Sequence, residues 1–289
     1  GRSQEETDYL NNEIGKAKLT ELTGNIAFAG FTAPKILWVK KNEPENFKKT
    51  VKIMLPKDYL VYRLSGAFTT DYSDASGFLL LDVKNRCYSK EMLDICGITE
   101  DMLPALHESS DIVGMMNKDL AKELGIEGEC ALIAGAGDNA GSAIGTGTIG
   151  EGKCNISLGT SGTIFISSSH FCPDNKNALH SFCDAAGAYH LLGCTLSAAS
   201  ARKWWLEQIR ETEDFAKDEI DVKAAGKKET EIFFMPYLLG ERSPYNDVNV
   251  RAAFLGLDAT TTKADMSRAV MEGVAFSLKD CLDCAKEDG

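Results

Sequence analysis

The chain has 289 residues, of which 44% are hydrophobic and 26% charged, a composition typical of a globular protein. At roughly 150 residues per domain, this length indicates about two domains or one large α/β domain. Lys and Arg number 31 against 43 Asp and Glu, so the net charge is −12 and we expect neither nucleic acid nor a membrane as a partner. No apolar run approaches the roughly 18 residues of a membrane span, and nine scattered cysteines favour the reduced thiols of a cytoplasmic protein.

The first third of the sequence predicts mostly helices. Two helical patterns each end at a glycine, which is a typical helix stop: residues 55–64 before Gly66, and residues 90–96 before Gly97. Two short strands are expected at residues 68–70 and 78–82.

The middle of the chain is rich in apolar and small residues. The run Glu129–Ala134 predicts a short buried strand, and it leads through glycines to Asp138 and a helix of small residues. Two strand-like runs, residues 154–158 and 163–168, are spaced as a hairpin. The composition changes near Gly150, where we place the domain boundary.

The last third predicts a strand at residues 189–193, a helix from about residue 197 to 210 and a closing helix from about 263 to 286. The highly charged stretch 211–231 between them predicts an exposed helix followed by a loop. Trp204 and Trp205 fit core and half-buried positions of the helix at 197–210 better than a platform for a sugar.

Asp138 follows the predicted strand and begins the next helix, which leaves two interpretations. As an N-cap, its carboxylate would accept a backbone N–H of its own helix. As a general base, it would use its exposure among glycines to reach a hydroxyl group of a polyol. The spacing alone favours the cap. Ligands of open α/β sheets bind where strands end, and the flanking glycines leave the carboxylate bare, which supports the base.

The hairpin turn Gly159-Thr160-Ser161-Gly162 also has two interpretations. It can be a plain turn in which glycine supplies a positive φ. It can also be an anion site, because successive N–H groups and two hydroxyl groups can surround a phosphate. A base on one side of a cleft and a phosphate site on the other is the arrangement that phosphoryl transfer requires. Arg242 could likewise bind a phosphate or belong to a salt-bridged loop.

Several stretches together resemble the FGGY family of carbohydrate kinases. Two fit family signatures: Gly30–Asn42 (GFTAPKILWVKKN), and Ala252–Leu257 followed by Asp265–Glu272. Three more resemble the members that act on D-xylulose: Leu55–Leu60, Ser73–Gly77 and His180–Cys183. These stretches span nearly the whole chain and are specific as a set.

The resemblance implies an α/β fold of the actin-like (ribonuclease H-like) ATPase type with two lobes. Residues 1–150 would form the sugar-binding N-terminal lobe and residues 151–289 the ATP-binding C-terminal lobe. The implied reaction transfers the γ-phosphoryl group of ATP to D-xylulose and gives D-xylulose 5-phosphate, with ATP and Mg²⁺ as cofactors.

The resemblance also assigns site residues. Asp138 matches the catalytic base in the family's Gly-Gly-Asp-Asn stretch, and Asn139 matches the neighbour that helps to hold the sugar. Arg2 matches the sugar-binding arginine of a Trp-x-Asp-x-Arg stretch, of which only the last residues are present. The four residues Gly159, Thr160, Ser161 and Gly162 match the second phosphate-binding loop. No metal ligand is assigned.

Three family motifs are absent from the sequence: the Asp-x-Gly-Thr loop, the Met-His-Gly segment and the adenosine-binding Gly-Gly-Gly-x-x-Ser stretch. We therefore expect an internal piece of a longer kinase, incomplete at both ends, that does not turn over ATP by itself. The missing strands would expose a sheet edge at which two copies could pair as a homodimer. The rival hypotheses are another FGGY kinase, for gluconate, ribulose or glycerol, and a non-catalytic sugar-binding module.

Overall fold

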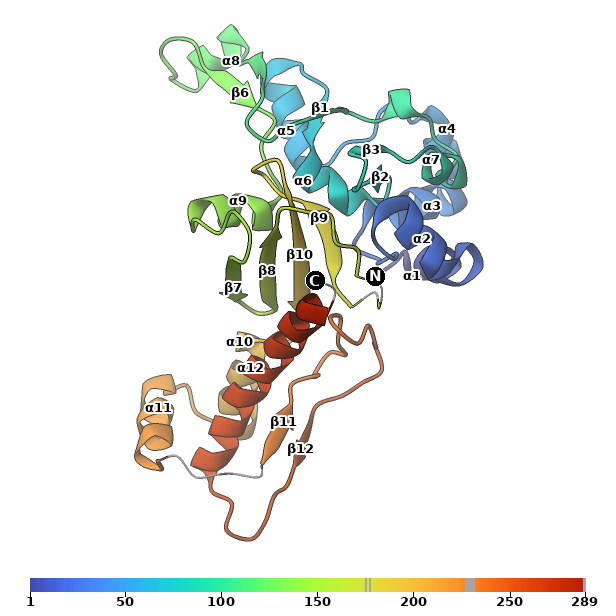
Figure 1. Cartoon of the computed structure of the whole chain (residues 1–289). Helices are drawn as coiled ribbons and strands as arrows, with labels where there is room; N and C mark the ends of the chain where they lie inside the picture. The colour runs from blue at the N-terminus through green and yellow to red at the C-terminus, as the bar shows by residue number, and fades with distance from the viewer. Residues whose placement is uncertain (175, 177, 227–231, 288–289) are drawn as a thin grey trace. The chain divides into compact units, whose positions relative to one another are not determined.

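The computed structural model describes residues 1–174, 176, 178–226 and 232–287. The chain divides into two compact units, each discontinuous in sequence. Unit 1 consists of Gly1–Lys153 and Ser167–Leu191, and unit 2 of Cys154–Ile166 and Leu192–Gly289. Helices and short strands occur in both units, as expected for the α/β class (Figure 1).

Unit 1 begins with helices. The first are α1 (Gln4–Tyr9), a π-helical turn (Leu10–Gly15), α2 (Lys16–Thr23), α3 (Thr32–Asn42) and α4 (Pro44–Lys49). The others are α5 (Pro56–Ser65), α6 (Tyr72–Ala75), α7 (Lys90–Cys96), α8 (Lys118–Glu123) and α9 (Asp138–Gly145), with 3₁₀ turns at Ser76–Phe78 and Glu100–Met102. Gly66 and Gly97 follow α5 and α7 with left-handed φ angles of 81° and 71°, so both predicted helix stops are confirmed.

The strands that lie wholly in the first 153 residues form three separate pairs. β1 (Thr69–Asp71) runs parallel to β4 (Ala105–His107), whereas β2 (Leu81–Asp82) with β3 (Cys87–Tyr88) and β5 (Ile112–Met115) with β6 (Ala131–Ile133) are antiparallel. The strand expected over residues 78–82 is reduced to two residues, because Phe78 ends a 3₁₀ turn and Leu79 has a left-handed φ of 59°.

The strand before Asp138 is not buried, contrary to the prediction from the apolar run Glu129–Ala134. In the part of the chain that the structure describes, β6 pairs with β5 alone, in a two-stranded antiparallel sheet. Ile133 is consequently 51% exposed. The apolar composition predicted a strand correctly, but it did not reveal that neighbours fail to cover its faces.

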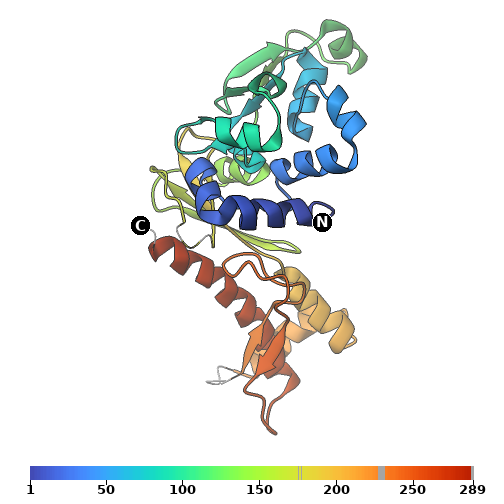
Figure 2. The same cartoon turned by 90° about the vertical axis from the view of Figure 1, so that its right-hand side faces the viewer.

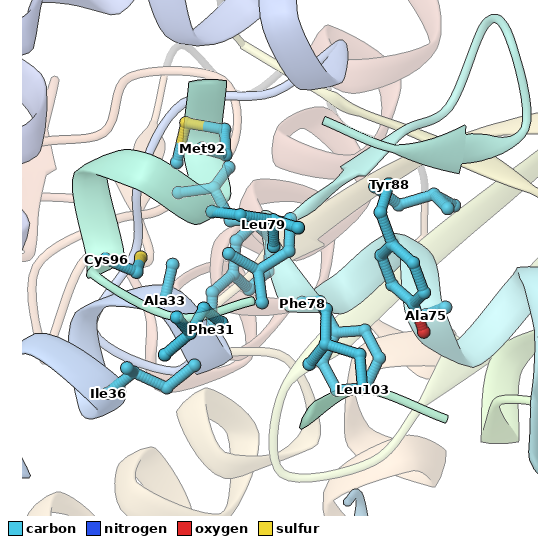
Figure 3. Packing of buried hydrophobic residues seen from close by; sticks show 14 of the residues in the cluster. Phe31, Ala33, Ile36, Ala75, Phe78, Leu79, Tyr88, Met92, Cys96 and Leu103 are labelled. Atoms are coloured by element: carbon cyan, nitrogen blue, oxygen red, sulfur yellow. The ribbon is translucent and has the colours of Figure 1, made fainter. Parts of the chain in front are cut away.

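The core of unit 1 joins segments that are far apart in sequence. Figure 3 shows a cluster in which Phe31 and Ile36, at and within α3, lie near Leu79 and Cys96. Leu79 and Cys96 are fully buried. Burial of such side chains stabilises a fold by about 1.5–3 kcal/mol each, so this cluster holds α3 against α7 and the turn before β2.

The second half of the chain contains the predicted hairpin. β7 (Cys154–Leu158) and β8 (Gly162–Ser168) pair antiparallel, with Leu158 opposite Gly162. They belong to a four-stranded sheet with the order β7-β8-β10-β9, in which β9 is His180–Cys183 and β10 is Tyr189–Thr195. The division between the units passes through β8 and β10. The hairpin and the third predicted strand are therefore confirmed.

In the described residues of unit 2, the other elements are three α-helices and a strand pair. The helices are α10 (Ala199–Trp204), which continues as a π-helical turn (Trp205–Ile209), α11 (Phe215–Ala224) and α12 (Lys263–Glu287). The strands β11 (Phe233–Met235) and β12 (Ala253–Leu255) are antiparallel. In the charged stretch, α11 is the predicted helix, and residues 227–231 lie outside the described residues.

Trp205 and α12 form the centre of the unit 2 core. Trp205 is 3% exposed, and its indole N–H donates to the Ser267 hydroxyl group at 2.8 Å. The rings of Phe234 and Phe254, from β11 and β12, pack 4.6 Å apart in the same cluster. The expected core role of Trp205 is therefore confirmed.

Helix α12 lies directly on β11 (Figures 1 and 2). A Cβ atom at Gly273 of α12 would lie 2.1 Å from the carbonyl oxygen of Phe234 in β11. Because this oxygen belongs to the backbone, it cannot move away as a flexible side chain would. Only glycine allows helix and strand to approach so closely.

We predict that Gly273→Ala lowers the free energy of unfolding by about 1–3 kcal/mol, although alanine favours helices by about 1 kcal/mol over glycine. Gly145→Ala in α9 is the matched control, because a Cβ atom there meets nothing within 4 Å. Urea denaturation measures both changes. A Gly273→Ala variant as stable as the parent protein would contradict the close approach.

Candidate functional site

Asp138 is the first residue of α9, and it is exposed. The Oδ1 atom of its carboxylate accepts the backbone N–H of Asn139 at 2.7 Å and the side-chain amide of Asn139 at 3.0 Å. In the described part of the chain, Oδ2 has no hydrogen-bond donor, so one carboxylate oxygen faces solvent.

The N-cap position of α9 is Gly137, not Asp138. The N-cap interpretation of Asp138 is therefore wrong, although its carboxylate does bind an N–H group of its own helix. A side chain at the N-cap would bind an N–H group two or three residues further on, whereas Asp138 binds only the next residue. Its carboxylate thus remains at the open end of the helix.

The loop before Asp138 is held by Lys57 of α5. The Lys57 Nζ atom lies 2.9 Å from Asp58 Oδ1, 2.9 Å from Asp71 Oδ1 and 2.9 Å from the carbonyl oxygen of Ala134, the residue directly after β6. The side chains of both aspartates are fully buried. Burial disfavours the ammonium group, but Asp71 and Asp58 outweigh it and raise the pKa of Lys57, so this lysine is charged at neutral pH.

Asp71 connects Lys57 to the end of the same loop. Its Oδ2 atom accepts the N–H of Ser73 at 2.9 Å, the Ser73 hydroxyl group, and the Ser109 hydroxyl group at 3.1 Å. The Ser73 oxygen in turn accepts the N–H of Gly137 at 3.0 Å. A continuous chain of polar contacts therefore runs from Lys57 to the residue before Asp138.

Gly135 fits the loop around Lys57. The Gly135 N–H donates to the carbonyl oxygen of Ser109 at 3.0 Å, and its φ of 85° is left-handed. A Cβ atom at Gly135 would lie 3.1 Å from Lys57 Cδ. Both the conformation and the tight space favour glycine at this position.

Asp74 of α6 is a second carboxylate beside Asp138. Burial is the largest of the effects that raise the pKa of Asp74 to about 6; Lys57 opposes it, and the negative charges of Asp71, Asp58 and Asp138 add to it. Asp74 Oδ2 lies 3.9 Å from Lys57 Nζ. The charge of Asp74 therefore changes within the range between pH 5 and 7.

We predict that Asp74→Asn makes the protein more stable at pH 7. Since the pKa of Asp74 is about 6 in the folded chain against an ordinary 3.8, ionisation penalises the folded state increasingly as the pH rises through this interval. The variant lacks this penalty, so its unfolding free energy should exceed that of the parent protein by about 1–3 kcal/mol above pH 6. The difference should disappear below pH 3.8, the ordinary pKa of the aspartate side chain. Urea denaturation at pH 4 and pH 7 measures it; an equal difference at both pH values would contradict the electrostatic cause.

The turn Gly159–Gly162 lies between β7 and β8 in unit 2. The carbonyl oxygens of Gly159 and Thr160 accept the N–H groups of Ala199 and Ala198 at 2.9 and 3.0 Å. Both carbonyl groups are thus bound to the beginning of α10. This fixes the turn and directs its partial negative charge toward the protein.

The amides of the same turn remain available. In the described residues, the N–H groups of Thr160 and Ser161 have no backbone or side-chain acceptor. Thr160 is exposed, whereas Gly162 is buried so tightly that a Cβ atom there would lie 2.8 Å from Thr195 Oγ1. Two unused N–H groups on a fixed turn suit an anion.

Arg242 follows a buried glutamate. Glu241 Oε1 accepts the N–H groups of Leu196 and Arg242 at 2.8 and 2.7 Å, and burial raises the pKa of Glu241. Burial lowers the pKa of the Arg242 guanidinium, while the Cys194 thiol has the opposite effect. Glu241 thus organises the backbone of this loop, and the two interpretations of Arg242 stay open.

The remaining predicted residues lie in unit 1. Arg2 is exposed just before α1, and its guanidinium carbon lies 5.0 Å from the centre of the Trp38 ring. Asn139 contacts the Asp138 carboxylate through both its backbone and its side chain. The structure therefore joins Asn139 to Asp138 directly.

Sequence reasoning missed four polar residues of this site: Lys57, Asp71, Ser73 and Asp74. Lys57, Ser73 and Asp74 stand in the family-like stretches Leu55–Leu60 and Ser73–Gly77, which received no role. The sequence offered one indication of this site: a lysine next to an aspartate, directly after the proline that begins a helix. What it contacts depends on the fold.

Two further findings concern the described residues alone. No helix in the described residues combines the length and apolar character that a membrane span needs. The described residues also contain no cluster of three or more His, Cys, Asp or Glu side chains suited to a metal ion.

Family models match both parts of the chain. Residues 1–145 match the N-terminal domain of the FGGY family of carbohydrate kinases, and residues 154–289 match its C-terminal domain. The chain is 38% identical to the xylulose kinase of Escherichia coli K12 over 98% of its own length, and 34% identical to that of Staphylococcus xylosus over 99%. It spans 58% and 60% of the lengths of these two relatives.

Solved structures agree in fold. A xyloylose kinase from Brucella ovis is 38% identical, with a TM-score of 0.94, and a gluconate kinase from Lactobacillus acidophilus is 27% identical, with a TM-score of 0.93. Each similarity covers 100% of this chain and 59% of the other. The predicted fold class, α/β of the actin-like ATPase type, is confirmed.

Proposed function

The chain belongs to the FGGY family of carbohydrate kinases, and from this premise we propose that the protein containing it phosphorylates D-xylulose with ATP. The products are D-xylulose 5-phosphate and ADP. Similarity to xylulose kinases over 98% of the chain supports this substrate. The observation that carries the proposal is the exposed Asp138 carboxylate at the start of α9, with one oxygen open and its loop anchored by Lys57.

Asp138 acts as the general base of this reaction. Its open Oδ2 atom takes the proton of the sugar hydroxyl group as the oxygen attacks the γ-phosphorus atom. The new P–O bond forms while the bond from the γ-phosphorus to the bridging oxygen of ADP breaks. Asn139 donates both its bonds to Oδ1, which orients the carboxylate and leaves Oδ2 for the substrate.

The other assigned residues bind the substrates. The open amides of Thr160 and Ser161, within the turn Gly159–Gly162, hold phosphate oxygens of ATP. Arg2 contacts the sugar. In this proposal residues 1–150 form the sugar-binding lobe, residues 151–289 contribute to the ATP-binding lobe, and the protein acts in the cytoplasm.

ATP and Mg²⁺ differ in how well the described residues fit them. The turn offers free amides for the phosphate groups of ATP. The described residues offer no carboxylate cluster for Mg²⁺, and this ion commonly keeps several waters while binding nucleotide phosphates.

The proposed substrate is tested with the protein that contains this chain, by coupling ADP release to NADH oxidation. We predict that kcat/KM for D-xylulose exceeds that for D-gluconate and for glycerol at least about tenfold, since a site built for one set of hydroxyl groups rejects analogues that leave its polar groups unpaired. A higher kcat/KM for D-gluconate or for glycerol would show that the preferred substrate is that compound and not D-xylulose. Binding of sugar with no ADP release for any substrate would favour a non-catalytic module.

The role of Asp138 is tested by Asp138→Asn. We predict a decrease in kcat of about 10²–10⁴-fold, because an amide cannot accept the proton, while the Kd for ATP stays within about twofold. Asp94→Asn, which changes an exposed carboxylate on α7, is the matched control and should leave kcat unaltered. An active Asp138→Asn variant would remove Asp138 from the role of base.

A further inference from the structure

We infer that Ser73 is a positioning residue for Asp138, acting by linking the Gly137 amide to the buried Lys57–Asp71 ion pair. The inference rests on the proposed function, since it assigns the residue that keeps the proposed base in place. Ser73 belongs to α6, and it is only 6% exposed. It touches neither oxygen of the Asp138 carboxylate in the described contacts, so it acts through the backbone.

Besides the bond from the Ala134 N–H to the Asp111 carbonyl oxygen at 3.0 Å, three contacts bind the loop between β6 and α9. Lys57 Nζ binds the Ala134 carbonyl oxygen at 2.9 Å, the Ser109 carbonyl oxygen binds the Gly135 N–H at 3.0 Å, and the Ser73 hydroxyl oxygen binds the Gly137 N–H at 3.0 Å. The Ser73 contact is the last one before Asp138. It therefore determines where α9 begins and where the carboxylate points.

Only one orientation of the Ser73 hydroxyl group satisfies both its partners. Its oxygen accepts the N–H of Gly137, and its hydrogen is donated to Asp71 Oδ2. The backbone N–H of Gly137 can only donate, so the hydroxyl hydrogen is the one that reaches Asp71 Oδ2. Hydrogen bonds to a charged acceptor are about twice as strong as neutral ones. The bond to Asp71 therefore fixes the Ser73 hydroxyl group, and this group in turn fixes the Gly137 amide.

The aspartates of the support behind Ser73 are buried. The side chains of Asp58 and Asp71 are fully buried, and Lys57 lies between them. Removing one member of a buried ion pair is strongly destabilising because the other charge is left without a partner, so substitutions at Lys57 or Asp71 threaten the fold. Ser73 is the member whose removal leaves the ion pair intact, and it is the one to test.

Ser109 provides a matched control. Its hydroxyl group donates to the same Asp71 Oδ2 atom at 3.1 Å, and it is buried, at 7% exposure. Its side chain has no described contact with the loop, which it binds through its backbone carbonyl group. Ser109→Ala therefore removes one bond to Asp71, whereas Ser73→Ala removes a bond to Asp71 and also the bond to Gly137.

The first measurement is steady-state kinetics of the two variants in the protein that contains this chain. Ser73→Ala should lower kcat about 10- to 100-fold, since a displacement of the base by about 1 Å has effects of this size. The KM values for ATP and D-xylulose should change by no more than about threefold, because the ground-state contacts persist. Ser109→Ala should keep kcat within about threefold. Equal losses of kcat in the two variants would overturn the inference. They would show that the lost hydrogen bond to Asp71 causes the effect and that the bond to Gly137 does not.

The second measurement does not depend on activity. Hydrogen–deuterium exchange at the Gly137 amide should become at least about tenfold faster in Ser73→Ala and stay near the parent rate in Ser109→Ala. Circular dichroism confirms that both variants are folded. If the parent protein does not phosphorylate D-xylulose, the proposed function is wrong. Hydrogen–deuterium exchange at the Gly137 amide then tests by itself whether Ser73 holds the loop. Unchanged exchange at Gly137 in Ser73→Ala overturns it.

Discussion

The ammonium group of Lys57 is the interaction on which the candidate site depends. It lies between two fully buried carboxylates, and it also binds the carbonyl group that follows β6. A buried charge is tolerated only when its partners surround it. The three partners come from α5, β1 and the loop after β6, so satisfying this one charge brings three distant segments together. Asp138 stands four residues after the bound carbonyl group, and its place follows from this arrangement.

The turn Gly159–Gly162 in unit 2 is also fixed by polar contacts, but here the contacts are hydrogen bonds between backbone groups and not ion pairs. The carbonyl groups of Gly159 and Thr160 accept N–H groups at the start of α10. The N–H groups of Thr160 and Ser161 are left without a protein acceptor in the described residues. In the proposed function these free amides bind phosphate groups, while Asp138 accepts the proton. In both places the chain uses its own polar groups to fix a short loop, and the remaining polar groups are left for a ligand.

Local features of this site could be predicted from the sequence, whereas long-range contacts could not. The glycines before Asp138 and the Gly159–Gly162 hairpin are patterns of neighbouring residues, and the structure has a loop and a turn at these positions. Lys57 binds a carbonyl group 77 residues away and Ser73 an amide 64 residues away, and no periodicity reports such contacts. The error about β6 has the same origin, because burial of a strand depends on which neighbours cover it.

A crystal structure of the protein with D-xylulose bound would test the central claim most directly. The account predicts a sugar hydroxyl group within hydrogen-bond distance, about 2.6–3.2 Å, of the Asp138 carboxylate. Lys57 should still contact Asp71 and the Ala134 carbonyl group in that complex. A sugar bound away from Asp138, or a loop that has left Lys57 while the sugar is in place, would contradict it.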